Sequence, residues 1–283
     1  MPFVQKMNNF FDVFIKDTTT APLQHCQYSF IIHINFNCYI ACFVVEFMYN
    51  LMIEMLKVCI KMKDNLSAYS SNDYDNRVCS VLPYYREYHF QILDLVKALN
   101  KDKIKWLDTG CGTGNLTQKA LEYFDNIEFT LCDPSENMLK TAKNKLGHKN
   151  IQYFNIDSQH LDFDNEFDIV TAVQSHHYLD MESRKTATKH CYQALKQSGI
   201  YITFENIALS TPQSDVIGIE RWKRFLASNG KTTEEIKSHV SRRGIEVFPI
   251  TVEQHIKLLR ECGFGSVDIL WASYMQAGLF AIK

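Results

Sequence analysis

From residue 104 onward, short apolar segments alternate with longer segments of helical pattern, and this alternation constrains the fold more than any other feature of the chain. The longer segments include SENMLKTAKNKL, for which Ser135 is a good N-cap, and MESRKTATKHCYQALK. Strands that alternate with helices of about ten to fifteen residues predict a parallel, doubly wound sheet. The apolar segments are KIKWLDTG, IEFTLCDP, IQYFNID, FDIVTAVQ and GIYITFEN.

The C-terminal end of the chain departs from this alternation. The helical segment TVEQHIKLLRECGF ends at Gly263, and the apolar segments SVDILWASY and MQAGLFAIK follow it. Because only a few residues separate these two segments, we expect them to pair as an antiparallel hairpin. The predicted fold class is therefore α/β, with a Rossmann-like, doubly wound, mostly parallel seven-stranded sheet and a C-terminal antiparallel hairpin.

Residues 107–114, LDTGCGTG, are the strongest local indication of a ligand site. Gly110, Gly112 and Gly114 allow a tight turn and a close approach of the backbone to a ligand. The helix expected after them presents free N–H groups, which attract a carboxylate. Dinucleotide-binding loops also occupy this place, but their usual pattern is GxGxxG, and Asn115 stands where the third glycine of that pattern would fall.

With Asp108 before it, the GxGxG loop resembles the first motif of class I methyltransferases that depend on S-adenosylmethionine (SAM). The resemblance covers residues 104–283 and implies SAM as the cofactor. The residues that it implies for cofactor binding are Asp108, Gly110, Cys111, Gly112, Gly114, Asp133, Met138, Asp157, Ser158, Gln174 and Tyr85.

The resemblance also implies roles for several of these residues. Asp108 would bind the methionine end of SAM through its ammonium group, and Asp133 would accept the ribose hydroxyls, a role that fits NAD equally well. Met138 would lie against the adenine, or else pack in the helix core. Asp157 and the Ser158 amide would bind the adenine edge, with a loop-capping role as the alternative for Asp157. Tyr85 would cover the cofactor or pack in the core.

The segment QSHHYL, residues 174–179, follows the fourth strand, in the crevice where ligands meet doubly wound sheets. His176 and His177 are the candidate general bases, because imidazole titrates near neutrality; packing around the cofactor is the alternative. Methyl transfer needs a base only when the acceptor must lose a proton. The loop lacks the Asn/Asp-Pro-Pro-aromatic motif of enzymes that methylate base amines, which disfavours such a substrate and leaves RNA open.

Two segments are expected to cover the site. Residues 62–103 form a helical cap, in which apolar residues from Phe90 to Leu99 recur at helical spacing. Residues 207–250 form a helical lid insertion of the methyltransferase domain 104–283. If an arginine of this insertion faces inward, the acceptor is anionic, whereas a solvated charged face is the alternative. The candidate substrate residues are Arg221, Trp222, Arg242 and Arg243.

The first 61 residues contain no glycine and no arginine, unlike the remainder. Three interpretations remain open for them: an upstream reading frame attached through a wrong start codon, with the functional protein beginning at Met62; a packed helix; and a membrane helix, which His33, Asn35 and Asn37 would interrupt.

Composition excludes few classes of protein. A formal net charge of -2 shows no basic excess, which disfavours a nucleic-acid partner without excluding one. Nine cysteines without CxxC or Cys/His spacing predict reduced thiols and no metal site. The leading interpretation is a cytoplasmic enzyme, with a homodimer left open, that methylates a small-molecule acceptor.

Other functions also remain open. The segments VEQHIKLLRECGF and ILWASYMQAGLFAIK resemble the enzyme that makes carboxy-SAM for tRNA wobble-uridine modification. That enzyme uses SAM and prephenate and needs an arginine for the new carboxylate. Arg242 and Arg243 lie in the corresponding region, but no shared motif anchors the alignment there. A catalytically silent SAM-binding module and an NAD oxidoreductase are further alternatives.

Overall fold

The computed structural model describes residues 47, 50, 65–147 and 150–283. The chain divides into two units, residues 1–62 and 63–283, and the second contains the sheet. The three interpretations of residues 1–61 concern residues that lie almost entirely outside the described ones. Within the described ranges, no helix is long and apolar enough to cross a membrane.

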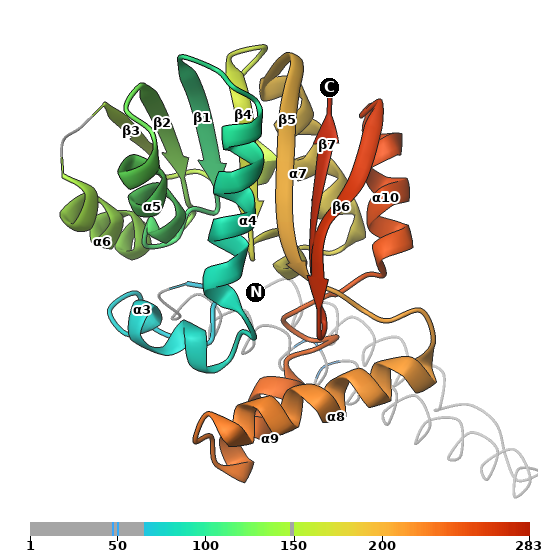
Figure 1. The fold of residues 1–283 in the computed structure, drawn as a ribbon. Helices are drawn as coiled ribbons and strands as arrows, with labels where there is room; N and C mark the ends of the chain where they lie inside the picture. Colours follow the sequence, from blue (N-terminus) through green and yellow to red (C-terminus); the bar gives the residue numbers. More distant parts are fainter. Residues whose placement is uncertain (1–46, 48–49, 51–64, 148–149) are drawn as a thin grey trace, which may run out of the picture. The chain divides into compact units, whose positions relative to one another are not determined.

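One seven-stranded sheet runs through the second unit in the order β3-β2-β1-β4-β5-β7-β6 (Figure 1). Strands β1 to β5 pair in parallel, and β7 is antiparallel to both β5 and β6. This order confirms the predicted α/β class, the seven strands and the C-terminal hairpin. The strands are β1 Ile104–Thr109, β2 Ile127–Cys132, β3 Ile151–Phe154, β4 Phe167–Val173, β5 Leu195–Asn206, β6 Ser266–Ser273 and β7 Gln276–Ile282.

Five of the described α-helices begin after a residue whose side chain caps the helix. Ser135 accepts a hydrogen bond from the Met138 N–H, as the sequence predicts, and Thr232 and Thr251 each open a helix with a capping box. The α-helices are α3 Tyr74–Arg77, α4 Tyr85–Ala98, α5 Asn115–Tyr123, α6 Glu136–Leu146, α7 Met181–Ala194, α8 Pro212–Ser228, α9 Thr233–Ser241 and α10 Val252–Glu261; the 3-10 turns are η1 Val78–Ser80, η2 Ser158–His160 and η3 His176–Tyr178.

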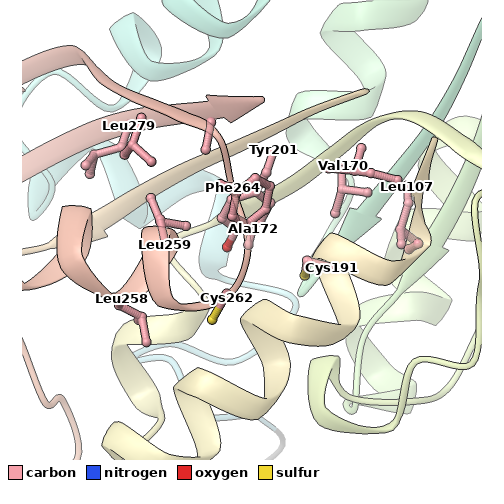
Figure 2. Packing of buried hydrophobic residues seen from close by; sticks show 14 of the residues in the cluster. Leu107, Val170, Ala172, Cys191, Tyr201, Leu258, Leu259, Cys262, Phe264 and Leu279 are labelled. Carbon is pink, nitrogen blue, oxygen red and sulfur yellow. The ribbon is translucent and has the colours of Figure 1, made fainter. Parts of the chain in front are cut away.

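Helices cover both faces of the sheet. Helices α7 and α10 bury Cys191, Leu258 and Leu259 against strand residues such as Val170 on one face (Figure 2). On the other face, α4, α5 and α6 pack on a cluster that includes the fully buried Trp106. This double cover explains why β4, and β5 from Gly199 to Asn206, are buried along nearly their whole length.

One boundary of the predicted elements is wrong. The helix predicted to run through Lys196 ends at Ala194, because the buried Leu195 already pairs with Phe167 as the first residue of β5. Phe90 lies outside the buried face of α4 and is 51% exposed, whereas Ile92, Leu93 and Val96 are buried.

The remaining helices lie at the end of the sheet where the parallel strands finish. There, α3, α8 and α9 lie beyond the carboxyl ends of these strands (Figure 1). The Trp222 indole N–H of α8 donates a 2.9 Å hydrogen bond to the Val81 carbonyl, which ties the segment before α4 to the 207–250 insertion. The two covering segments predicted from the sequence are thus in contact.

Candidate functional site

The polar residues of the candidate cofactor site lie at one edge of the sheet. Asp108 is in the last part of β1, Asp133 follows β2, Asp157 follows β3 and Gln174 follows β4. Because these four strands are parallel, their carboxyl ends meet at the same edge. The sheet therefore brings together residues that are up to 66 positions apart in the chain, from Asp108 to Gln174.

The three glycines of the LDTGCGTG loop all have positive φ angles, between +55° and +76°. A Cβ atom added to Gly110 would lie 2.4 Å from the Ser175 Cβ, and one at Gly114 would lie 2.8 Å from Leu146. At Gly112, an added Cβ would meet no atom within 4 Å. The loop therefore packs on the protein through Gly110 and Gly114 and faces open space at Gly112.

Asp108 is a buried carboxyl group at this edge. Its Oδ1 accepts a 2.7 Å hydrogen bond from the Thr171 hydroxyl, and the residue is 2% exposed. Burial raises the pKa of Asp108 to about 7, and the nearby Asp133 carboxylate adds to the rise while the Thr171 hydrogen bond opposes it. A carboxyl group in this state gains from a positively charged partner.

Asp133 organises the glycine loop. Its Oδ2 accepts a 2.8 Å hydrogen bond from the Gly112 N–H, and its Oδ1 accepts a 2.9 Å hydrogen bond from the Ser135 N–H. One carboxylate thus holds both the glycine loop and the start of α6.

The residues after β3 have partners within the protein. Asp157 Oδ1 accepts a 2.9 Å hydrogen bond from the Gln159 N–H, so the loop-capping interaction considered from the sequence is present. The Ser158 hydroxyl lies 2.8 Å from the Thr109 hydroxyl, next to the end of β1. Met138 is 4% exposed in the first turn of α6.

The three other predicted cofactor residues surround the loop. The Cys111 N–H donates a 3.1 Å hydrogen bond to the Cys132 carbonyl, which ties the loop to β2. Tyr85 is buried in α4, and its hydroxyl is 3.5 Å from the Asn115 side-chain nitrogen at the start of α5. Gln174 adopts a φ of +53° and donates from Nε2 to the Gln276 side chain over 2.9 Å.

The two candidate bases of η3 have different surroundings. The His176 ring stacks on Tyr201, its Nδ1 is 3.2 Å from the Tyr201 hydroxyl, and its buried Nε2 has no hydrogen-bond partner. Burial lowers the pKa of His176 to about 4. His177 instead lines a pocket, and its Nδ1 is 2.7 Å from Glu205 Oε2. The structure therefore brings His177, and not His176, to the pocket.

Two buried charged residues that the sequence analysis missed hold this loop. Glu205 of β5 is 0% exposed and contacts both histidines of η3. Arg184 of α7 is 1% exposed and donates to the carbonyls of His176 and Leu179. An ionisable residue is rarely this buried unless it is paired, so their burial is the signal that identifies them, and only the fold reveals it.

The pocket lies between three segments that are distant in the chain. The segment before α4 contributes Tyr74 and Val81, the loop after β4 contributes Gln174 and His177, and the insertion 207–250 contributes further residues. Among the described residues no carboxylate lines the pocket, and its walls combine aliphatic and aromatic side chains with amide, imidazole and guanidinium groups. Across the described residues, no cluster of His, Cys, Asp or Glu is placed to hold a metal ion.

The structure separates the four residues predicted for substrate binding. Trp222, Arg242 and Arg243 line the pocket, whereas Arg221 is exposed and lies over the Tyr274 ring, 4.6 Å from its centroid. Trp222 is largely buried and packs against Val81 and Leu226.

Both pocket arginines have carboxylate partners. Arg242 Nε donates to Glu246 over 2.8 Å, and its Nη2 donates to the Leu66 carbonyl over 2.7 Å. Arg243 Nη2 is 3.2 Å from Asp215, and its Nη1 donates to the Asn206 side chain over 2.5 Å. Glu246 and Asp215 do not line the pocket, so they neutralise the charges of the two arginines without facing into it.

A further contact joins the segment before α4 to the glycine loop. Asp75 of α3 accepts hydrogen bonds from the hydroxyl of Thr113, the amide of Asn115 and the ammonium group of Lys145, at 2.5 to 2.8 Å. These hydrogen bonds lower the pKa of Asp75 although burial opposes them. We refer to residues 65–82, which contact the glycine loop at Asp75 and the insertion at Val81, as the strap.

Comparison with known proteins agrees with this arrangement. A protein-family profile described as a methyltransferase domain matches residues 107–199, which span the glycine loop and the η3 loop. Residues 107–199 are thus similar to a methyltransferase domain. The fold is similar to that of the magnesium protoporphyrin IX methyltransferase of Synechocystis, a protein solved with bound S-adenosylhomocysteine (16% identity, TM-score 0.51, 70% of this chain and 83% of that one).

The methyltransferase domain also has distant relatives over most of the chain. It is 27% identical to a carboxy-S-adenosyl-L-methionine synthase of Staphylococcus epidermidis, over 77% of this chain and 95% of that protein. It is 24% identical to a synthase of the same description from Nautilia profundicola, over 75% of this chain and 94% of that protein. The resemblance stated from the C-terminal segments is therefore confirmed as a distant homology.

Proposed function

We propose that this chain transfers the methyl group of SAM to a small-molecule acceptor. In this proposal SAM binds at the carboxyl edge of the sheet, against the LDTGCGTG loop. The acceptor binds in the neighbouring pocket under the strap. The proposal rests on the fit of the edge residues to SAM and on the contact between the edge and the pocket.

The chemistry of the edge residues fits SAM. Gly112 faces open space, so its backbone can approach a ligand closely. The buried Asp108 gains a counter-charge if the α-ammonium group of SAM lies beside it, which lowers the raised pKa of its carboxyl group. Asp133 is bonded to the Gly112 N–H, so its carboxylate lies at the loop where the ribose hydroxyls of SAM would bind.

The observation that carries the proposal is the contact between the glycine loop and the loop after β4. Gly110 packs directly on Ser175. Gln174, one residue before Ser175, and His177, two residues after it, both line the pocket. A methyl group presented at the glycine loop would thus lie beside the pocket. Alignment of this kind supplies much of the rate of a direct displacement.

SAM supplies an electrophilic methyl group on a positively charged sulfur. The protein's part is to hold the acceptor in line with that methyl group and to exclude water, which the strap and the insertion are placed to do. If the acceptor atom carries a proton, His177 is the residue of the pocket placed to take it. His176 has no such access, and we assign it a structural role in the core.

The wall of the pocket favours an anionic acceptor. Arg242 is the better candidate for binding it, because its side chain is 16% exposed, whereas that of Arg243 is 9% exposed and fixed between Asp215 and Asn206. A planar guanidinium can bind a carboxylate or phosphate with two hydrogen bonds. Trp222 contributes apolar surface to the same wall.

The proposal is tested by incubating the full chain with SAM that carries a labelled methyl group, together with pools of small carboxylates, phosphates and neutral compounds. Transfer of label to one pool, with S-adenosylhomocysteine formed in equal amount, supports the proposal. If SAM binds but no pool is labelled and no S-adenosylhomocysteine forms, methyl transfer is not the reaction.

A second candidate is a carboxy-SAM synthase-like activity, and the distant homology to such synthases favours it. Mass spectrometry distinguishes the two. Incubation with SAM and prephenate, the co-substrate that the resemblance implies, would yield carboxy-SAM in this case. The methyl-transfer proposal instead predicts that SAM is recovered unchanged from this mixture, or is converted to S-adenosylhomocysteine.

A further inference from the structure

Glu205, at the end of β5, is the most deeply buried carboxylate near the pocket. It is 0% exposed and receives four hydrogen bonds. Its Oε1 accepts from the His176 N–H at 3.2 Å and the Thr203 hydroxyl at 2.9 Å. Its Oε2 accepts from the His177 N–H at 2.9 Å and lies 2.7 Å from the His177 Nδ1. Every group that faces this side chain is able to donate.

The surroundings keep Glu205 ionised. Burial alone would raise the pKa of its carboxyl group, but the hydrogen bond and charge of His177, with further contributions from His176 and His255, lower it to about 2. A carboxylate has only acceptors, so the ring nitrogen at 2.7 Å must carry the hydrogen of that contact. The Asn206 N–H also points towards this nitrogen, but at 3.5 Å it lies beyond ordinary hydrogen-bond length.

We infer that Glu205 is a positioning residue: it holds His177 as the tautomer that carries its proton on Nδ1, and so leaves the lone pair of Nε2 to the pocket. The tautomer follows from the geometry alone, whereas its catalytic meaning rests on the proposed function. Since a neutral imidazole has one donor and one acceptor nitrogen, fixing Nδ1 as the donor decides the state of Nε2.

Glu205 also fixes where the ring stands. It binds the backbone N–H groups of His176 and His177 from one side of η3. From the other side, Arg184 binds the carbonyls of His176 and Leu179. The Phe248 N–H donates a 2.7 Å hydrogen bond to the His177 carbonyl. Because these hydrogen bonds fix the backbone of η3, a rotation of the His177 ring would break its hydrogen bond to Glu205.

In the proposed reaction, the acceptor atom forms its bond to the methyl carbon while the carbon–sulfur bond of SAM breaks, and the electron pair of that bond stays on sulfur. The proton of the acceptor goes to His177 Nε2. The resulting imidazolium is stabilised by the Glu205 carboxylate, which itself stays ionised. Glu205 thus never touches the acceptor and acts through His177.

The first test is the tautomer of His177 in the full chain. The protein is labelled with ¹⁵N-histidine, loaded with S-adenosylhomocysteine and studied by NMR at pH 8, and the His177 signals are assigned by their loss in His177→Gln. We expect a protonated Nδ1 and an unprotonated Nε2. A His177 ring that carries its proton on Nε2 in the unmodified protein would overturn the inference, whether or not any variant folds.

The second test uses Glu205→Gln, with Glu205→Asp as the conservative variant. In the glutamine variant one oxygen becomes an NH₂ group that faces donors, so we expect the Nδ1–H tautomer to be lost or mixed. With the acceptor found in the labelling screen, kcat should fall about 100-fold or more, while the SAM affinity changes less than about threefold. The aspartate variant should recover part of kcat.

These readouts separate the inference from the proposed function. If the tautomer is as expected but no methyl transfer is found, the proposed function fails and the positioning of His177 stands. If methyl transfer occurs and Glu205→Gln leaves both the tautomer and kcat unchanged, the inference fails and the proposed function stands.

Discussion

Gly110 and Ser175 are packed so closely that a Cβ atom at Gly110 would lie 2.4 Å from the Ser175 Cβ. This contact joins the loop after β1 to the loop after β4, and with them the proposed cofactor site to the acceptor pocket. The geometry of methyl transfer would therefore depend on the close packing of Gly110 on Ser175.

We expect Gly110→Ala to unfold at a lower temperature and to lose SAM binding. The new methyl group would overlap Ser175, and the φ of +66° adds strain. Thermal unfolding followed by circular dichroism, with and without SAM, measures both effects. An alanine variant with unchanged stability and SAM affinity would show that the two loops are not in contact.

Gly112→Ala tests the ligand-facing side of the same loop. It has room for a Cβ, so its only structural cost is the φ of +55°, about 1 kcal/mol of strain. Gly230→Ala is the matched control, because Gly230 also has a positive φ and no atom within 4 Å of an added Cβ. Both variants should lose similar stability, but only Gly112→Ala should weaken SAM binding, by at least about tenfold. Equal SAM affinities would place the cofactor elsewhere.

The raised pKa of Asp108 predicts that the stability of the folded protein depends on pH. Its pKa is raised from 3.8 to about 7 in the folded protein. Between pH 3.8 and about pH 7, the carboxyl group is therefore mostly protonated in the folded state and mostly ionised in the unfolded state. Stability therefore falls as the pH rises through this range, and Asp108→Asn should melt several degrees above the unmodified protein at pH 8 but not near pH 4.

SAM binding should depend on pH in the opposite direction. Below pH 7 Asp108 becomes protonated in the free protein and no longer attracts an ammonium group, so the SAM affinity should be about tenfold weaker at pH 6 than at pH 8. Asp108→Asn should bind weakly at both values. A pH-independent affinity in the unmodified protein, measured by calorimetry, would remove Asp108 from the site.

The hydrogen bonds of Asp75 predict that the strap contributes to cofactor binding. Asp75→Asn keeps the shape but weakens the contacts with Lys145 and Thr113, so the SAM affinity should fall by about tenfold. Lys103→Ala removes the exposed Lys103–Glu128 pair and serves as the control, because surface ion pairs contribute little. Equal effects of the two variants would contradict a specific role of the strap.

Arg242 and Arg221 form a matched pair for the acceptor. Arg242 lines the pocket, whereas Arg221 lies outside it against Tyr274. With an anionic acceptor, Arg242→Ala should raise the KM about tenfold or more, and Arg221→Ala should leave it unchanged. Steady-state kinetics with varied acceptor measures the difference, and an unchanged KM in Arg242→Ala would exclude this arginine from the acceptor site.

The sequence predicts the fold well because its signals are local. The alternation of apolar strands and helices, the cap at Ser135 and the short connection between the last two strands each depend on a few neighbouring residues. The element that was misplaced, the start of β5, depends on a distant partner, since Leu195 pairs with Phe167. The packing of α4 on the sheet decides which of its apolar residues are buried, and it leaves Phe90 exposed.

Most of the contacts in the site that the sequence does not predict join residues that are far apart in the chain. Glu205 is 28 residues from His177 and reaches it only because β4 and β5 pair in parallel. Asp75 is 38 residues from Thr113. The arginines of the insertion can be recognised as candidates from their residue type, but which of them faces the pocket depends on how α8 and α9 pack on the strap.

The central claim, that the carboxyl edge of this sheet binds SAM, is tested most directly by titration calorimetry of the full chain with SAM at pH 8, repeated with Gly112→Ala. The account predicts saturable binding of one SAM per chain, and a clear loss of affinity in Gly112→Ala. A full chain that is folded by circular dichroism but releases no heat with either SAM or S-adenosylhomocysteine, at several temperatures, would contradict it.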